Sequence, residues 1–170
     1  MLRWIGAGLL LAGSVGLGVS GVRRLEQRVG ALRAVSAAME LIQCELDFRA
    51  PPMRELLETA AAHSSEPAAS FLHMCAEKAG QADGKPLAGL WRQCVTQRLA
   101  VLRDDEQECL ISVGEVLGRY DVQSQRCALI RAREQLDAYL SAAVQERQQK
   151  GRVYGALSTA AGTFLVILLS

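Results

Sequence analysis

The sequence has little that would interrupt a helix and little that would build a sheet. It contains four prolines in 170 residues. The alternation of apolar and polar residues that a half-buried strand needs never persists, whereas apolar residues recur every three or four positions. The sequence therefore predicts an all-α fold, a compact bundle of about six helices. Its clearest apolar stripe consists of Leu25, Val29, Leu32, Val35, Met39, Ile42 and Leu46.

Charge is absent from both ends of the chain. Residues 4–22 carry no charged side chain over nineteen positions, and residues 153–170 carry none either. A helix rises about 1.5 Å per residue, so roughly twenty residues cross a bilayer core about 30 Å thick. We therefore predict a transmembrane helix at residues 1–22, a helical bundle at 23–150 and a second transmembrane helix at 151–170. No proline lies between positions 122 and 169, so one helix can run from the bundle into the second span.

Basic residues stand beside both apolar ends, on the side that faces the middle of the chain. Positive charge next to a span holds that side in the cytoplasm, where it also meets lipid headgroups. The pattern predicts a multi-pass protein of the cell membrane with its bundle facing the cytoplasm. The flanking residues are Arg23, Arg24, Arg28, Arg147, Lys150 and Arg152.

An alternative is that the first apolar segment is a cleaved signal peptide. The stretch "GVSG" provides small residues at which a signal peptidase could cut. The chain would then be a secreted or surface helical interaction module. The basic residues that begin directly after the segment favour an uncleaved span, since only Arg3 precedes it.

Small residues recur every four positions in both predicted spans. They give each helix one smooth side, along which another helix backbone can approach closely in lipid. We expect these sides to pack against each other or against another subunit, and a second copy of the chain, forming a homo-oligomer, is one such subunit. The residues are Gly8, Ala12, Gly16 and Ser20 in the first span, and Gly151, Gly155, Thr159 and Thr163 in the second.

Residues that could carry catalysis are scarce. The two histidines, His63 and His73, have no spacing to a cysteine that is typical of a metal site or a thiol–histidine pair. No phosphate-binding glycine loop follows a strand, and a net charge of +1 gives no reason to expect nucleic-acid binding. We predict no enzymatic activity, no cofactor and no metal. A membrane-bound enzyme that uses Cys75 or His73 is the opposing hypothesis.

The five cysteines are odd in number and far apart in the sequence, and most fall on apolar helical faces. This usage predicts buried, reduced thiols in a reducing compartment.

Two polar stretches mark helix boundaries. In "DDEQE" at 104–108, Asp105 followed by Glu108 resembles a capping box, and a docking patch for a basic partner is the alternative. In "VGEVLGRYDVQSQ", glycines end one helix and an aspartate caps the next, while a glutamine lies in the apolar stripe. We expect this second connection to tie neighbouring helices together or to bind a partner. Its residues are Gly114, Gly118, Asp121 and Gln125.

Taken in order, these features resemble the stage III sporulation protein AB family of endospore-forming bacteria. The resemblance covers an N-terminal span leading into "GVRRLEQRVGALRAVSAAMELIQCEL", the turn and helix "APPMRELLETAA", and an "ILL" tail. The family element LG-x-x-D-x-x-x-Q stands as Leu117, Gly118, Asp121 and Gln125. Pro51 and Met53 depart from the threonine and leucine usual in the family.

The resemblance implies a function that the residue patterns do not supply. Proteins of this family belong to a secretion-like channel assembly between mother cell and forespore. Their bundle is similar to the cytoplasmic domain of the type II secretion inner-membrane platform protein. The resemblance therefore implies that this chain is a non-enzymatic platform subunit in the mother-cell membrane around the forespore. Its partners would be the cytoplasmic ATPase and the other membrane subunits of the stage III A complex.

Overall fold

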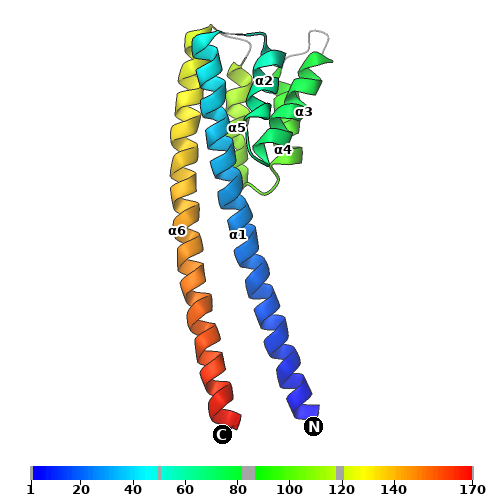
Figure 1. Cartoon of the computed structure of the whole chain (residues 1–170), viewed down its shortest axis with the longest axis vertical. Helices are drawn as coiled ribbons and strands as arrows, with labels where there is room; N and C mark the ends of the chain where they lie inside the picture. The colour runs from blue at the N-terminus through cyan, green and yellow to red at the C-terminus, as the bar shows by residue number, and fades with distance from the viewer. Residues whose placement is uncertain (1, 50, 82–86, 118–120, 170) are drawn as a thin grey trace. The chain divides into compact units, whose positions relative to one another are not determined.

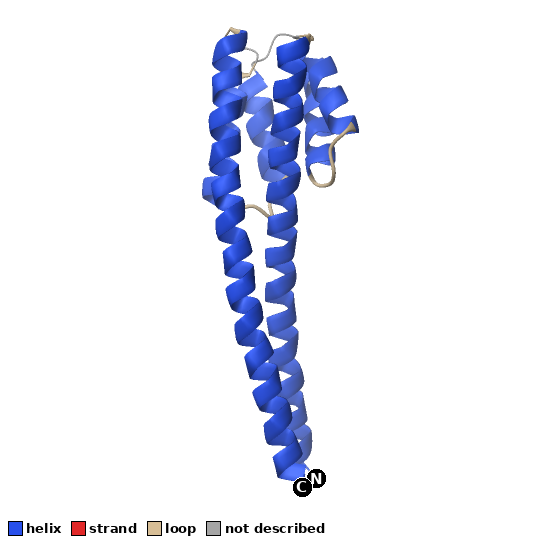
Figure 2. Ribbon diagram, turned by 60° about the vertical axis from the view of Figure 1, so that its left-hand side comes forward, coloured by secondary structure: helices blue, strands red, loops and turns tan. Residues whose placement is uncertain are grey.

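A computed structural model describes residues 2–49, 51–81, 87–117 and 121–169. Within the first and last helices it describes side chains only at residue 21, at 23–48 and at 122–151. The described residues form six helices and no strand, as the sequence predicted (Figures 1 and 2). The helices are α1 (Leu2–Phe48), α2 (Met53–Ala62), α3 (Ala68–Gly80), α4 (Leu87–Arg98), α5 (Asp104–Val116) and α6 (Val122–Leu169).

The chain forms two compact units, and α1 and α6 contribute to both. The larger unit spans Arg28–Ser141 and holds the second part of α1, all of α2 to α5 and the first part of α6. The smaller unit combines Met1–Gln27 with Ala142–Ser170.

In the larger unit, α1 and α6 are antiparallel neighbours joined by polar side chains. Arg133 Nη2 lies 3.0 Å from Glu40 Oε2. Asp47 follows Glu40 by two turns on α1, and Arg126 precedes Arg133 by two turns on α6. Asp47 Oδ1 lies 3.4 Å from Arg126 Nε. The equal steps fit a single antiparallel alignment of the two helices between these pairs.

The apolar stripe predicted on α1 is confirmed as the core-facing side of that helix. All seven of its residues are buried, and Leu32, Val35 and Ile42 are fully enclosed. Burying a large apolar side chain stabilises a protein by about 1.5–3 kcal/mol. The helix ends at Phe48, and α2 begins at Met53 after Pro51 and Pro52, so the predicted proline break is also confirmed.

Trp91 of α4 links three helices of the core. Its ring meets Phe71 of α3 edge to face, with 4.9 Å between ring centroids. Its Nε1 donates a hydrogen bond of 2.8 Å to the carbonyl oxygen of Leu110 in α5. The indole is completely buried, so this bond satisfies the one polar group that a tryptophan brings into a core.

The smaller unit has its own contacts next to the apolar ends. Leu25 and Ala143 are buried, and Arg147 Nη2 lies 2.8 Å from Glu26 Oε1. In the part of the chain whose side chains are described, no helix is both long enough and apolar enough to cross a bilayer. Apart from Gly21 and Gly151, the side chains of the predicted spans at 1–22 and 151–170 lie outside that part.

Candidate interaction site

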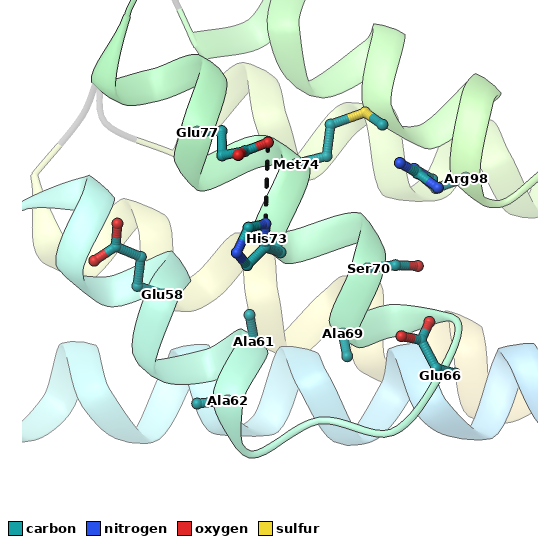
Figure 3. Close-up of a pocket in the computed structure, with 10 residues that line it drawn as sticks. All are labelled: Glu58, Ala61, Ala62, Glu66, Ala69, Ser70, His73, Met74, Glu77 and Arg98. Atoms are coloured by element: carbon teal, nitrogen blue, oxygen red, sulfur yellow. Dashed lines mark ion pairs between the residues drawn. The ribbon is translucent and has the colours of Figure 1, made fainter.

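An open groove of about 390 Å³ lies between α2 and α3 in the larger unit (Figure 3). Helix α2 ends at Ala62, and α3 begins after Pro67, with a short turn between them. Two consecutive helices therefore form the walls of the groove. Arg98, the last residue of α4, stands at its edge. The lining residues are Glu58, Ala61, Ala62, Glu66, Ala69, Ser70, His73, Met74, Glu77 and Arg98.

The inner surface of the groove is apolar and its margin is charged. Ala61 is buried, while Ala69 and Met74 are half-buried. The exposed residues include three carboxylates against one guanidinium, that of Arg98. The combination of small apolar side chains with exposed charge is suited to contact with another protein.

The three carboxylates differ in how far their charge is already neutralised. Glu58 Oε1 lies 2.8 Å from Arg54 Nε within α2. Glu77 Oε2 lies 4.0 Å from His73 Nδ1 within α3. No ion pair joins Glu66 to any other residue in the described part of the chain. The groove therefore keeps an excess of negative charge that a partner can meet.

A buried ion pair connects α1 to the start of α5. Arg28 Nε lies 3.0 Å from Glu106 Oε1 and 3.1 Å from Oε2. Arg28 is 6% exposed and Glu106 is fully buried. This position corrects the expectation that Arg28 flanks a membrane span, because its guanidinium is committed to a carboxylate inside the bundle.

Glu106 also defines the N-terminus of α5. Its Oε2 accepts a hydrogen bond of 2.8 Å from the backbone N–H of Arg103. The capping interaction is therefore two residues earlier than the predicted pairing of Asp105 with Glu108. One carboxylate thus caps a helix and neutralises a buried cation, a double role that the local sequence pattern does not reveal.

The other predicted flanking residues with described side chains lie in the smaller unit. Arg23, Arg24, Arg147 and Lys150 are exposed. Lys150 Nζ lies 2.8 Å from Glu146 Oε1. The side chain of Arg152 lies outside the described residues, as do those of Gly8, Ala12, Gly16, Ser20, Gly155, Thr159 and Thr163. Gly151 is exposed, and a Cβ there would meet nothing within 4 Å.

The first glycine of the predicted connection between α5 and α6, Gly114, was expected to end a helix, and this prediction is wrong. Gly114 lies inside α5 and is buried; it does not end the helix. A Cβ at this position would lie 2.3 Å from Cδ1 of Trp91. The residue therefore permits α4 and α5 to approach closely, which is a packing role. Gly118 lies outside the described residues.

Asp121 caps α6. Its Oδ1 accepts a 2.6 Å hydrogen bond from the Ser124 hydroxyl, and its Oδ2 lies 3.2 Å from the Ser124 backbone nitrogen, which donates to it. These bonds favour the carboxylate and lower the pKa of Asp121. Gln125 is buried on the inner side of α6, one turn after the cap.

The cysteines divide into a buried and an exposed set, which corrects the expectation of burial for two of them. Cys75, Cys94 and Cys109 are buried, whereas Cys44 and Cys127 are exposed. A hydrogen bond to Cys94 and burial raise the pKa of Cys75, and burial raises that of Cys109, so neither thiol is activated as a nucleophile. Among the described residues, no group of three His, Cys, Asp or Glu side chains could hold a metal ion.

The fold and the groove define an all-helical protein whose larger unit carries a charged surface suited to protein contacts. A family model described as stage III sporulation protein AB matches residues 3–170. The chain therefore belongs to the stage III sporulation protein AB family, as the sequence resemblance indicated.

A solved structure of stage III sporulation protein AB (SpoIIIAB) has the same fold. The two chains are 21% identical, the match covers 72% of this chain and 98% of the other, and the TM-score is 0.65. No curated protein sequence matches the chain significantly.

Sequence reasoning missed the groove. Its carboxylates are spread over 58–77 and separated by a turn, and Arg98 comes from another helix. A local signal did exist, since "HSSEP" marks a tight return between two short amphipathic helices. The acidic excess at that return becomes visible only once the two helices are packed together.

Proposed function

We propose that this chain is a non-enzymatic platform subunit of the sporulation stage III A complex. Both of its ends span the mother-cell membrane around the forespore, and its bundle faces the mother-cell cytoplasm. There it docks the cytoplasmic ATPase of the complex, while its spans meet the other membrane subunits. The complex acts as a secretion-like channel between mother cell and forespore.

The observation that carries this proposal is the family match over residues 3–170, which includes both apolar ends. Two further features support it. Arg23, Arg24, Arg147 and Lys150 are exposed next to those ends. Arg147 and Lys150 are paired with carboxylates of the chain, so Arg23 and Arg24 are the two that lipid headgroups would neutralise. The α2–α3 groove supplies a charged, partly apolar surface on the bundle.

Docking is tested by copurification. The full chain, carrying an affinity tag, is solubilised from membranes of sporulating cells in mild detergent. We expect the ATPase of the complex to copurify with it in the presence and absence of nucleotide. An unrelated membrane protein with the same tag is the control. Recovery of the ATPase at the level of that control would refute the docking role.

The alternative, a secreted module with a cleaved signal peptide, is tested by N-terminal sequencing of the same purified chain. An N-terminal sequence starting near Gly21 would show cleavage, whereas the proposal requires the mature chain to retain residues 1–22.

A further inference from the structure

We infer that the α2–α3 groove is the docking surface of the bundle and that it takes a cationic segment of a protein partner, with lysine or arginine beside small apolar side chains. This inference rests on the proposed docking role and adds to it the position and chemistry of the contact.

The charge of the groove selects the class of occupant. Of its three carboxylates, Glu58 is paired with Arg54. Glu66 has no ion-pair partner among the described residues, and Arg98 is the one guanidinium in the lining. Lipid headgroups of the bacterial membrane and nucleic acids are anionic, so both would be repelled. A positively charged surface is the complement that would speed association and fix the orientation of the complex.

A metal ion does not account for this charge. Within the described part of the chain, the carboxylates and histidines form no group of three that could coordinate a cation. Glu58 and Glu77 are already oriented along their own helices toward Arg54 and His73. A cationic protein segment is the occupant that the charge of the groove fits.

The apolar inner surface indicates how the segment is held. Ala61, Ala69 and Met74 offer small or adaptable contacts over which a helix or extended segment can lie closely. Ser70 Oγ is already bonded to the carbonyl of Pro67 at 3.1 Å, so it adds little competing polarity. The groove is open, whereas pockets that take a small molecule bury most of its surface.

A matched pair of charge variants tests the site with the ATPase of the complex as probe. Glu66→Gln with Glu77→Gln neutralises two groove carboxylates without changing their size. Glu108→Gln with Glu134→Gln is the control, because both residues are exposed outside the groove. We expect the full-length groove variant in membrane vesicles to bind the ATPase about tenfold more weakly, with less than a twofold change for the control.

Salt gives a second readout of the same contact. Raising ionic strength should weaken binding to the wild-type chain more than binding to the groove variant, because exposed charge pairs are screened. Equal affinities for wild type and groove variant, or equal losses in the groove and control variants, would overturn the inference and leave the docking role intact.

If the wild-type chain does not bind the ATPase, the proposed docking function fails. Crosslinking then tests separately whether the groove contacts a protein partner. A photoreactive phenylalanine derivative replaces His73, which is 69% exposed in the groove, or Gln123 on α6 as control, in sporulating cells. The inference requires that the photoreactive group at position 73, but not the one at position 123, forms an adduct with a partner peptide containing lysine or arginine. The yield of this adduct should fall when Glu66→Gln and Glu77→Gln are also present. Without such an adduct, the groove is not a docking site.

Discussion

At the scale of single residues, close packing around Trp91 depends on a missing side chain. Gly114 faces an indole that is buried and held by a hydrogen bond to Leu110, so the ring has little freedom to withdraw. Gly114→Ala should therefore destabilise the bundle by about 1–3 kcal/mol, the usual cost of overpacking. Chemical denaturation of the full chain in detergent measures the change.

Gly30→Ala is the matched control for this prediction. Gly30 is an exposed residue inside α1, and a Cβ there would meet nothing within 4 Å. Because alanine loses less backbone entropy than glycine, this variant should gain about 0.5–1 kcal/mol. Similar effects of the two substitutions would contradict the packing role of Gly114.

The buried pair of Arg28 and Glu106 predicts an asymmetric mutational response. Glu106→Gln leaves a buried guanidinium without a countercharge and should cost about 3–5 kcal/mol. Adding Arg28→Met should recover part of this loss, since the double variant contains no buried charge. Thermal unfolding of the wild type and of these two variants measures the differences in stability.

An exposed carboxylate on the same helix provides the reference. Glu108 lies 3.7 Å from Arg92, and both are well exposed, so Glu108→Gln should change stability by less than about 1 kcal/mol. If Glu106→Gln were as mild as Glu108→Gln, or if the double variant were worse than the single one, the pair would not stabilise the bundle as described.

At the scale of the helix, Asp121 makes the start of α6 sensitive to acid. Bonds from Ser124 lower the pKa of Asp121 in the folded chain. Its stabilising contribution is therefore complete above the unfolded-state pKa of about 4 and is lost as pH falls through the lower folded-state pKa. We expect the melting temperature of Asp121→Asn to lie below that of wild type at pH 7.

The difference between these two melting temperatures should narrow as the pH falls below about 4, because protonated aspartate is then also neutral. Asparagine remains a competent cap, so the comparison isolates the charge. A difference that stays constant from pH 7 to pH 2 would show that the ionised carboxylate is not what stabilises the cap.

Helix positions could be predicted from the sequence because their signals are local. The stripe on α1 and the break at Pro51 and Pro52 follow from spacing and from backbone chemistry, and the structure confirms both. The N-terminus of α5 was misplaced because several carboxylates there could serve as its cap. The choice of Glu106 depends on Arg28, which lies 78 residues away in the sequence.

The candidate site was predictable only in part, for the same reason. Asp121 was identified as a helix cap because the cap and the residues it bonds are adjacent in the chain. Gly114 was expected to end a helix, and its true neighbour, Trp91, comes from α4. Burial of Arg28 and the gathering of charge at the groove likewise arise from tertiary packing, which composition and periodicity do not encode.

At the scale of the whole molecule, the small residues of the proposed spans suggest how the subunit joins its complex. Gly16→Leu would add a bulky side chain to the smooth side of the first span. We expect membrane insertion to be unchanged, because leucine is at least as apolar as glycine, and recovery of the assembled complex to fall several-fold.

Quantitative recovery of the complex from detergent extracts, normalised to inserted chain, checks this prediction. Leu9→Ile, within the same segment, controls for a general effect of substitution. Equal recovery of the complex with Gly16→Leu and wild type would refute the packing role.

The most direct test of the account is the side of the membrane on which the bundle lies. The native thiols suit this measurement, since Cys44 and Cys127 are exposed and Cys75, Cys94 and Cys109 are buried. The full chain is produced in growing cells without a forespore and treated with a membrane-impermeant maleimide. A cytoplasmic bundle predicts no labelling in intact cells and labelling of Cys44 and Cys127 after lysis. Labelling of either cysteine in intact cells would contradict the account.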